Sequence, residues 1–308
     1  MTVISQPLQR SRSGQPVLSA GRLKVLIILL PYLWMSLFFL APFFVIIKIS
    51  LAESIVGTPP FTPLFEMVDG AREYIGSIDN FIYIVGDNSY AEALFTSFLT
   101  AAGAALACLA IGYPAAYAVA RAPRRYRTPL LLALVLPFWT SFLLRVYAWI
   151  GLLDTYGPIN QFLMKLGLID QPLIMLHTNF AVYLGIVYTY LPFMILPLYS
   201  TLERLDQVLD EAATDLGATP LRVFTDVTLP LSLPGILAGC FMVFIPAMGE
   251  YVIPTLLGDA RSLMIGRKLY DEFFVNHDWP TASAVTILML LIVVPPVVFL
   301  QRQSSRQE

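Results

Sequence analysis

Residues 201–230 read TLERLDQVLDEAATDLGATPLRVFTDVTLP, and this segment separates two long apolar runs at residues 180–202 and 227–249. Apolar side chains recur in its first half at steps of three and four residues, with acidic residues between them. These positions are Leu202, Leu205, Leu209, Ala212, Ala213 and Leu216. The pattern predicts an amphipathic helix that lies outside the membrane.

The turn after this helix follows from three residues. Gly217 favours a left-handed cap that ends the first helix. Thr219 can accept the first free amides of a second helix, and Pro220 suits the first turn of that helix. The segment is therefore predicted to form a sharp helix-turn-helix elbow.

The composition of the elbow favours docking to another protein. Ala212 and Ala213 permit close approach, and the carboxylate of Glu211 can pair with an arginine of a partner. The alternative is an ordinary connecting loop, but two capped helices are longer than bundle connections need.

The rest of the chain has the composition of a protein in lipid. Of its 308 residues, 57% are apolar and 13% are charged, and the mean hydropathy is +0.71. Runs long enough to cross a bilayer lie at residues 25–47, 93–120, 129–144 with a mixed continuation to 153, 180–202, 227–249 and 282–301. The sequence predicts an all-α polytopic membrane protein with six transmembrane helices. They form one domain, residues 25–301, between tails at 1–24 and 302–308.

Basic residues orient the predicted spans. The short loop RAPRRYR, residues 121–127, lies between the second and third spans and carries the densest cluster of arginines. Because short basic loops stay inside, alternate threading puts this loop, both termini and the loop 203–229 in the cytoplasm. Loop 48–92 is then periplasmic, and the chain is predicted to be a multi-pass protein of the bacterial inner membrane.

The predicted outer loop is acidic, and two interpretations remain open. Its acidic residues are Glu53, Glu66, Asp69, Glu73, Asp79, Asp87 and Glu92. Outer loops are poor in basic residues in general. Alternatively, this surface concentrates cations or meets a docking partner.

Several sequence features limit the chemistry of the chain. It contains no GxxxxGKS or GxxxxGKT phosphate loop, so any ATP must bind elsewhere. The net charge of −2 does not suggest nucleic acid, and the cysteines and histidines lack metal-ligand spacing. We expect no metal, no cofactor and no enzymatic activity in this chain.

The elbow also carries a family resemblance. Glu211-Ala212-Ala213, then Gly217, then Leu229-Pro230 resemble the EAA signature of permease subunits of ATP-binding-cassette (ABC) importers. The resemblance extends over nearly the whole chain. LPFWTSFLLRVYAWIGLL at residues 136–153 and FIPAMGEYVIPTLLG at 244–258 look like polyamine permeases, most of all those of putrescine systems.

The resemblance implies a fold, a role for the elbow and a set of partners. The fold would be that of a type I ABC importer permease, and the elbow would be the coupling helix seated in a cleft of the ATPase. The implied coupling residues are Glu211, Ala212, Ala213, Asp215, Gly217, Thr219, Pro220 and Arg222. The implied partners are a second homologous permease, two ATPase subunits that bind ATP and Mg, a periplasmic polyamine-binding protein and membrane lipid.

A diamine dication needs carboxylates or aromatic faces along its path. Glu250 is the sole carboxylate in a strongly apolar run, and it either attracts cargo or pairs with Arg145. The remaining candidates are Tyr251, Trp139, Tyr147, Trp149 and Asp154. Aromatic residues near a membrane surface are also common anchors, and Asp154 is alternatively an ordinary loop acid.

Two other classes of protein compete with an ATP-driven importer. A self-contained secondary carrier predicts intramembrane charge pairs and internal repeats, and only Glu250 with Arg145 supports it. A polytopic membrane enzyme predicts clustered acids and histidines at one depth, and the sequence has none. We favour an importer permease for putrescine, or for spermidine or another small cationic or amino-acid-like solute.

Overall fold

The N-terminal unit is one apolar helix. The computed structural model describes residues 20–68, 71–259 and 263–304, so the predicted tail falls largely outside the described residues. The helix consists of α1 (Ala20–Met35), the π-helical turn η1 (Ser36–Leu40) and α2 (Ala41–Ser50). Its apolar stretch Ile27–Ser50 has a mean hydropathy of 2.1 and is long enough to cross a bilayer, which confirms the first predicted span.

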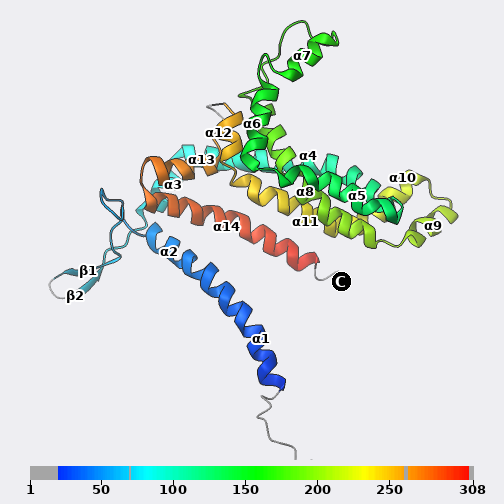
Figure 1. Cartoon of the computed structure of the whole chain (residues 1–308). Helices are drawn as coiled ribbons and strands as arrows, with labels where there is room; N and C mark the ends of the chain where they lie inside the picture. The colour runs from blue at the N-terminus through cyan, green and yellow to red at the C-terminus, as the bar shows by residue number, and fades with distance from the viewer. Residues whose placement is uncertain (1–19, 69–70, 260–262, 305–308) are drawn as a thin grey trace, which may run out of the picture. The chain divides into compact units, whose positions relative to one another are not determined.

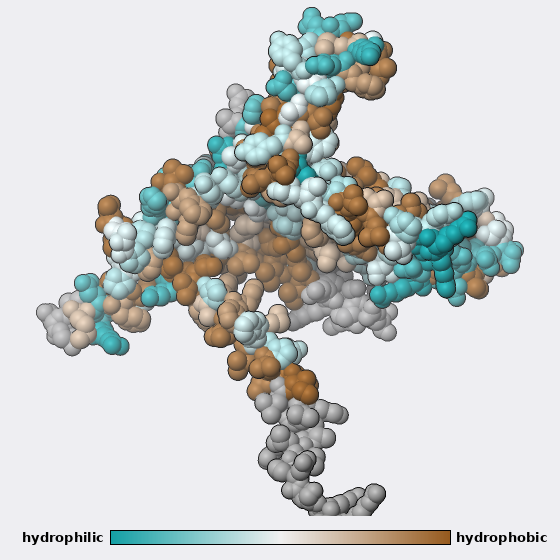
Figure 2. Space-filling model, in the orientation of Figure 1, coloured by the Kyte–Doolittle hydropathy of each residue, from teal (hydrophilic) through white to brown (hydrophobic). Residues whose placement is uncertain are grey.

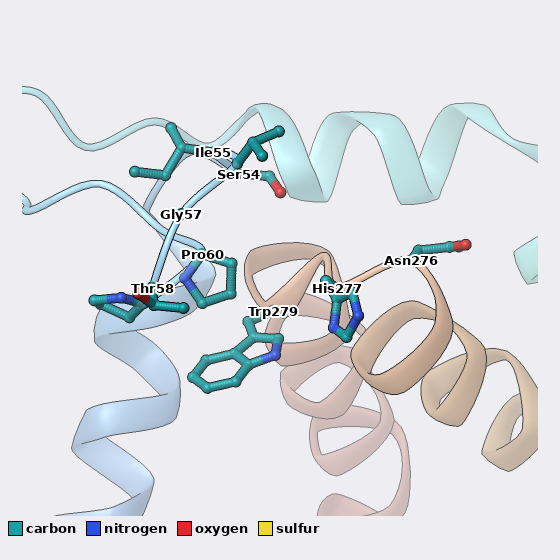
Figure 3. A pocket seen from close by; sticks show the side chains of 10 residues that line it. Ser54, Ile55, Gly57, Thr58, Pro60, Asn276, His277 and Trp279 are labelled. Atoms are coloured by element: carbon teal, nitrogen blue, oxygen red, sulfur yellow. The ribbon is translucent and has the colours of Figure 1, made fainter.

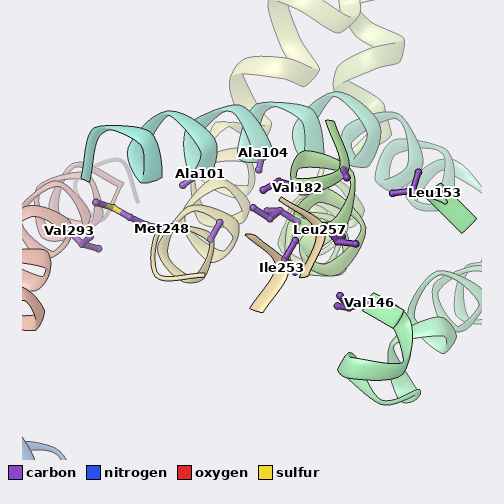
Figure 4. Packing of buried hydrophobic residues seen from close by; sticks show 12 residues of the cluster. Ala101, Ala104, Val146, Leu153, Val182, Met248, Ile253, Leu257 and Val293 are labelled. Carbon is purple, nitrogen blue, oxygen red and sulfur yellow. The ribbon is translucent and has the colours of Figure 1, made fainter. Parts of the chain in front are cut away.

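The second unit, residues 49–308, is built on three long helices that pack on one another. They are α4 (Asn88–Arg121), α8 (Asn179–Arg204) and α11 (Leu229–Met248), and α14 (Trp279–Ser304) runs beside α11 (Figure 1). A Cβ at Gly239 would lie 2.7 Å from Sδ of Met194, and one at Gly112 would lie 3.0 Å from its Cγ. Met194 of α8 therefore fills notches in both neighbours, as small residues permit in membrane bundles. A second cluster joins Ala101, Ala104, Val182, Met248 and Ile253 (Figure 4).

The predicted third span is broken in the structure. Its first arm is α5 (Arg124–Val135) with the 3-10 turn η2 (Leu136–Trp139), and its second is α6 (Phe142–Leu153) with α7 (Pro158–Lys165). The arms meet at 85°. Pro137 has no N–H to continue the helix, and the hydroxyl of Thr140 donates to the Pro137 carbonyl at 2.7 Å. The predicted span, residues 129–144 with its continuation to 153, therefore covers parts of both arms of a bent helix pair.

The number of spans depends on this bend. Among the described residues, five helices are long and apolar enough to cross a membrane, or six if the bent pair counts as one span. The predicted six helices lie at the upper end of that range.

The predicted outer loop contains a small hairpin. Strands β1 (Phe65–Val68) and β2 (Ala71–Tyr74) pair antiparallel, with Phe65 opposite Tyr74, and helix α3 (Asp79–Gly86) follows. This hairpin departs from the predicted all-α chain. It was not predicted because four-residue strands are too short to leave a clear alternating pattern in the sequence.

The two ends of the bundle carry different elements. The elbow end has α9 (Gln207–Asp215), α10 (Pro220–Val223) and the π-helical turn η3 (Phe224–Thr228). The opposite end has α3, α12 (Val252–Leu257), α13 (Ile265–Tyr270) and the π-helical turn η4 (Asp271–Val275) (Figure 1). Hydrophilic residues gather at the elbow end, and apolar side chains dominate between the ends (Figure 2). The bundle therefore has a polar elbow end and the apolar middle of a membrane-spanning protein.

Candidate functional site

The first helix of the elbow begins later than predicted. Helix α8 continues to Arg204, and the carboxylate of Asp206 then accepts the amide of Val208 at 3.1 Å to start α9. Leu202 belongs to α8, where it is 2% exposed in the bundle core. The prediction of a single amphipathic helix from Leu202 is therefore wrong, because the segment is divided between α8 and α9, and Asp206 caps the start of α9.

The turn of the elbow has the predicted left-handed glycine. Gly217 has φ +85°, its amide donates to the carbonyl of Thr214 at 2.9 Å, and the Ala218 amide donates to Ala213 at 3.0 Å. A Cβ atom at Gly217 would meet no atom within 4 Å. The constraint on this position is therefore conformational and not steric.

The start of the second elbow helix is only partly as predicted. Pro220 occupies its first turn, and Thr219 stands at the N-cap but makes no capping hydrogen bond through its side chain. The helix continues through η3 into α11, so the elbow and the span behind it form one run, Pro220–Met248. The second helix of the elbow is therefore continuous with a helix that is long and apolar enough to cross a membrane.

Most of the predicted coupling residues lie on the surface of the elbow. Exposed are Glu211, Ala212, Asp215, Gly217, Thr219, Pro220 and Arg222, and Ala213 is half-buried. The same surface presents Leu216, which is 90% exposed, and Leu221, which is 73% exposed. Leucines this open beside small and charged residues are typical of a surface that another protein covers.

Asp210 anchors the elbow to the bundle, a role that the sequence analysis missed. Its carboxylate pairs with Arg121 at the end of α4 and accepts the hydroxyl of Thr228 at 3.3 Å. Arg127 pairs with Glu203 at 3.2 Å. The arginine cluster and the elbow therefore share one end of the bundle. The signal for this anchor in the sequence was the presence of acidic residues in one predicted cytoplasmic loop and arginines in another.

Replacing Asp210 with alanine should loosen the elbow without unfolding the bundle. Charge-assisted hydrogen bonds are worth about 1.5–3 kcal/mol, so amide hydrogen exchange in α9 should accelerate roughly tenfold or more. Hydrogen–deuterium exchange followed by mass spectrometry checks this. Glu66→Gln, at an exposed position in β1, is the control and should leave α9 unchanged. If α9 in Asp210→Ala exchanged its amide hydrogens as slowly as in the unaltered protein, the contacts of Asp210 would contribute nothing to the stability of α9.

Glu250 lies at the break between α11 and α12 and is 7% exposed. One carboxylate oxygen accepts the amides of Val252 at 3.0 Å and Ile253 at 3.3 Å, and the other accepts the hydroxyl of Tyr190. The side chain thus caps α12 and ties it to α8. Sequence reasoning missed Tyr190, although a phenol within an apolar run needs a polar partner.

The predicted pair between Arg145 and Glu250 is not formed. The ion pairs among the described residues are those of Asp210 and Glu203, and the Arg145 guanidinium lies 4.8 Å from the ring centroid of Phe138. Its Nε and Nη1 are buried without a hydrogen-bond partner. The amides at the start of α12 lie two and three residues from Glu250, and these local donors hold its carboxylate.

Tyr190, Val252 and Ile253 donate the hydrogen bonds that the Glu250 carboxylate accepts, and the other path candidates have contacts of their own. Tyr251 follows Glu250 and stacks on Tyr270 with centroids 4.1 Å apart. Along the bent arm, Trp139 is 77% exposed and Tyr147 is 59% exposed. Trp149 meets Tyr188 edge-on at 5.4 Å. Asp154 is exposed in a turn, where it accepts the amide of Tyr156 at 2.9 Å.

The fold is that of the permease subunits of type I ABC importers. The chain superposes with a TM-score of 0.65 on a chain from the crystal structure of a bacterial ABC transporter involved in the import of the acidic polysaccharide alginate. The match covers 93% of this chain and 96% of that one, at 17% identity.

The chain belongs to the family of inner-membrane components of binding-protein-dependent transport systems, whose model matches residues 18–307. It is 43% identical over 217 residues to the spermidine/putrescine transport system permease protein PotB of Escherichia coli (strain K12), covering 70% of this chain and 78% of that protein. The Haemophilus influenzae PotB is 44% identical over 208 residues, 66% and 73% of the two chains. The inner membrane ABC transporter permease protein YdcU of Escherichia coli (strain K12) is 30% identical over 228 residues, 70% and 72% of the two chains.

Proposed function

We propose that this chain is one permease subunit of an ATP-driven polyamine importer, with putrescine as the main cargo. The observation that carries the proposal is the 43% identity to a permease named for spermidine and putrescine. The absence of a phosphate loop from the sequence supports a motor on a separate polypeptide. In this assignment, two ATPase subunits bind ATP and Mg, and a second homologous permease completes the path.

The elbow is the part of this chain that receives force from the ATPase. Its exposed surface, Glu211 to Arg222, enters a cleft of the ATPase, and Ala212 allows the close approach. Leu216 and Leu221 are exposed apolar anchors for that cleft. Because α10 continues into α11, closing of the ATPase dimer moves this span. The elbow and both termini face the cytoplasm in this assignment, which agrees with the arginine cluster at the elbow end.

The opposite end of the bundle then faces the periplasm and a binding protein that delivers the cargo. Glu250 supplies negative charge on the path, and Tyr251 supplies an aromatic face beside it. Trp139, Tyr147, Trp149 and Asp154 lie along the bent arm and line its approach.

Competitive uptake decides the cargo. The complete complex, reconstituted with its ATPase and binding protein, should take up labelled putrescine in an ATP-dependent manner. Unlabelled putrescine should compete best, and equimolar amino acids should not compete. Stronger competition by spermidine would assign spermidine as the cargo, and uptake without the ATPase would refute the importer assignment.

A further inference from the structure

Six aromatic rings form a continuous series at the end of the bundle opposite the elbow, here called the aromatic ladder. Their order is Tyr251, Tyr270, Phe274, Phe273, Trp279 and Phe61, and successive centroids lie 4.1, 4.8, 4.8, 5.0 and 6.2 Å apart. Helix α13, the π-helical turn η4 and the start of α14 supply the middle rings. Residues far apart in the sequence are thereby joined into one row.

The two ends of the aromatic ladder lie at distinct features. At one end, Tyr251 directly follows the buried carboxylate of Glu250. At the other end, Phe61 follows Trp279, and Trp279 lines a cavity of about 520 Å³ together with residues 54–60, Asn276 and His277 (Figure 3). The ladder therefore connects an open cavity to the candidate path.

The rings of the aromatic ladder are not packed away as core. Phe274 is 58% exposed, and the other five rings are half-buried. Core aromatics of this bundle, such as Tyr90 at 1% exposure, are enclosed instead. The ladder therefore keeps ring surface available to a ligand.

Charged residues of both signs lie beside the aromatic ladder. Asp271, next to Tyr270, forms no hydrogen bond or ion pair through its carboxylate with the residues that the structure describes. The ammonium of Lys268 instead interacts with α4, because it donates a hydrogen bond to the Ser89 hydroxyl and lies 3.8 Å from the ring centroid of Tyr90. Arg267 is the opposing charge.

Asp271 and Arg267 both act electrostatically on Tyr251, the first ring of the aromatic ladder. The pKa of the Tyr251 hydroxyl is raised, first by desolvation and then by the neighbouring Tyr270. The charge of Asp271 raises this pKa further, and the charge of Arg267 lowers it.

We propose that the aromatic ladder, with Asp271, is a binding track for an organic dication between the cavity at Trp279 and Glu250. A ring attracts a cation within about 6 Å of its centroid. Tyr251 is stacked on Tyr270, so this pair presents its outer faces to a cation. The same holds for Phe273 and Trp279, which are also stacked. This inference rests on the proposed function and assigns the outer entrance of the polyamine path.

Charge variants of opposite sign provide the first test. The assay is equilibrium binding of labelled putrescine to the complete complex in nanodiscs, without the binding protein and without ATP. Asp271→Asn should weaken binding about fivefold, and Arg267→Gln should strengthen it by a similar factor. The neutral isostere 1,4-butanediol should not compete. Changes in the same direction, or no change, would overturn the track.

Ring variants provide the second test. Trp279→Leu should weaken putrescine binding about tenfold, and Trp279→Phe should stay within about twofold, because phenylalanine keeps the aromatic face. Phe95→Leu is the control, since Phe95 is 64% exposed on α4 and lies outside the ladder. If the rings only anchor the protein in the membrane, Trp279→Leu and Phe95→Leu will bind alike, and the track is refuted.

The same experiments separate this inference from the proposed function. Suppose that the unaltered complex takes up putrescine with ATP and that the ladder variants bind putrescine normally. This result would refute the binding track and leave the proposed function intact. Ladder-dependent putrescine binding in a complex that never transports would refute the importer function and support the track.

Discussion

Gly217→Val should reduce substrate-stimulated ATP hydrolysis of the complete complex to its basal rate while the protein still inserts and assembles. Valine strongly disfavours the left-handed conformation, φ +85°, that Gly217 adopts. The strain costs about 1–3 kcal/mol, enough to change the turn and lower coupling by on the order of tenfold or more. ATPase assays in nanodiscs with loaded binding protein measure the effect.

Two controls isolate the conformation of the turn. Gly217→Asn adds a side chain of similar size in open space, but asparagine tolerates the left-handed region, so stimulation should be largely retained. Gly167→Val places the same strain at another left-handed glycine, φ +67°, after α7 and away from the elbow. Its ATPase stimulation should match that of the unaltered protein. Normal stimulation in Gly217→Val would remove the elbow from the coupling mechanism.

Glu250→Gln should reduce putrescine uptake about tenfold with normal assembly. Glutamine can keep the geometry, because its oxygen can accept the amides of Val252 and Ile253 and its amide nitrogen can donate to the Tyr190 oxygen. The substitution therefore removes mainly the negative charge, which acts strongly on a dication where water is scarce. Initial uptake rates at saturating loaded binding protein give the measurement.

Tyr190→Phe is the matched control for Glu250. It removes the hydroxyl that bonds the carboxylate, but it leaves the charge and both amide contacts of Glu250. Uptake should stay within about twofold of normal if charge is what the cargo requires. Equal losses in Tyr190→Phe and Glu250→Gln would assign Glu250 to structure, as the cap of α12.

Features that depend on neighbouring residues could be predicted from the sequence. Apolar runs predicted the membrane-crossing helices because burial in lipid depends on the composition of about 20 consecutive residues. The left-handed cap at Gly217 was equally predictable, since the conformation belongs to that residue and its turn. Pro220 at the start of α10 follows from the same local chemistry. These features define the bundle and its elbow.

Features that depend on competition between distant groups could not be predicted. The sequence left Arg145 as a possible partner of Glu250, but Tyr190 and the first amides of α12 hold the Glu250 carboxylate instead. The 85° bend after Trp139 likewise depends on how the two arms pack, and Pro137 alone only permits it. Pairwise contacts of this kind leave no periodic signal in the chain.

The sequence by itself determined that this protein crosses a membrane and carries a capped elbow, because hydropathy and turn chemistry act over a few neighbouring residues. Only the tertiary structure decided that Asp210 anchors the elbow to Arg121, that Glu250 caps α12, and that Phe61 joins the rings near Trp279. The physical reason is that each of these groups has several possible partners of similar chemistry elsewhere in the chain, and the sequence does not distinguish between them. Packing of the whole bundle selects among them.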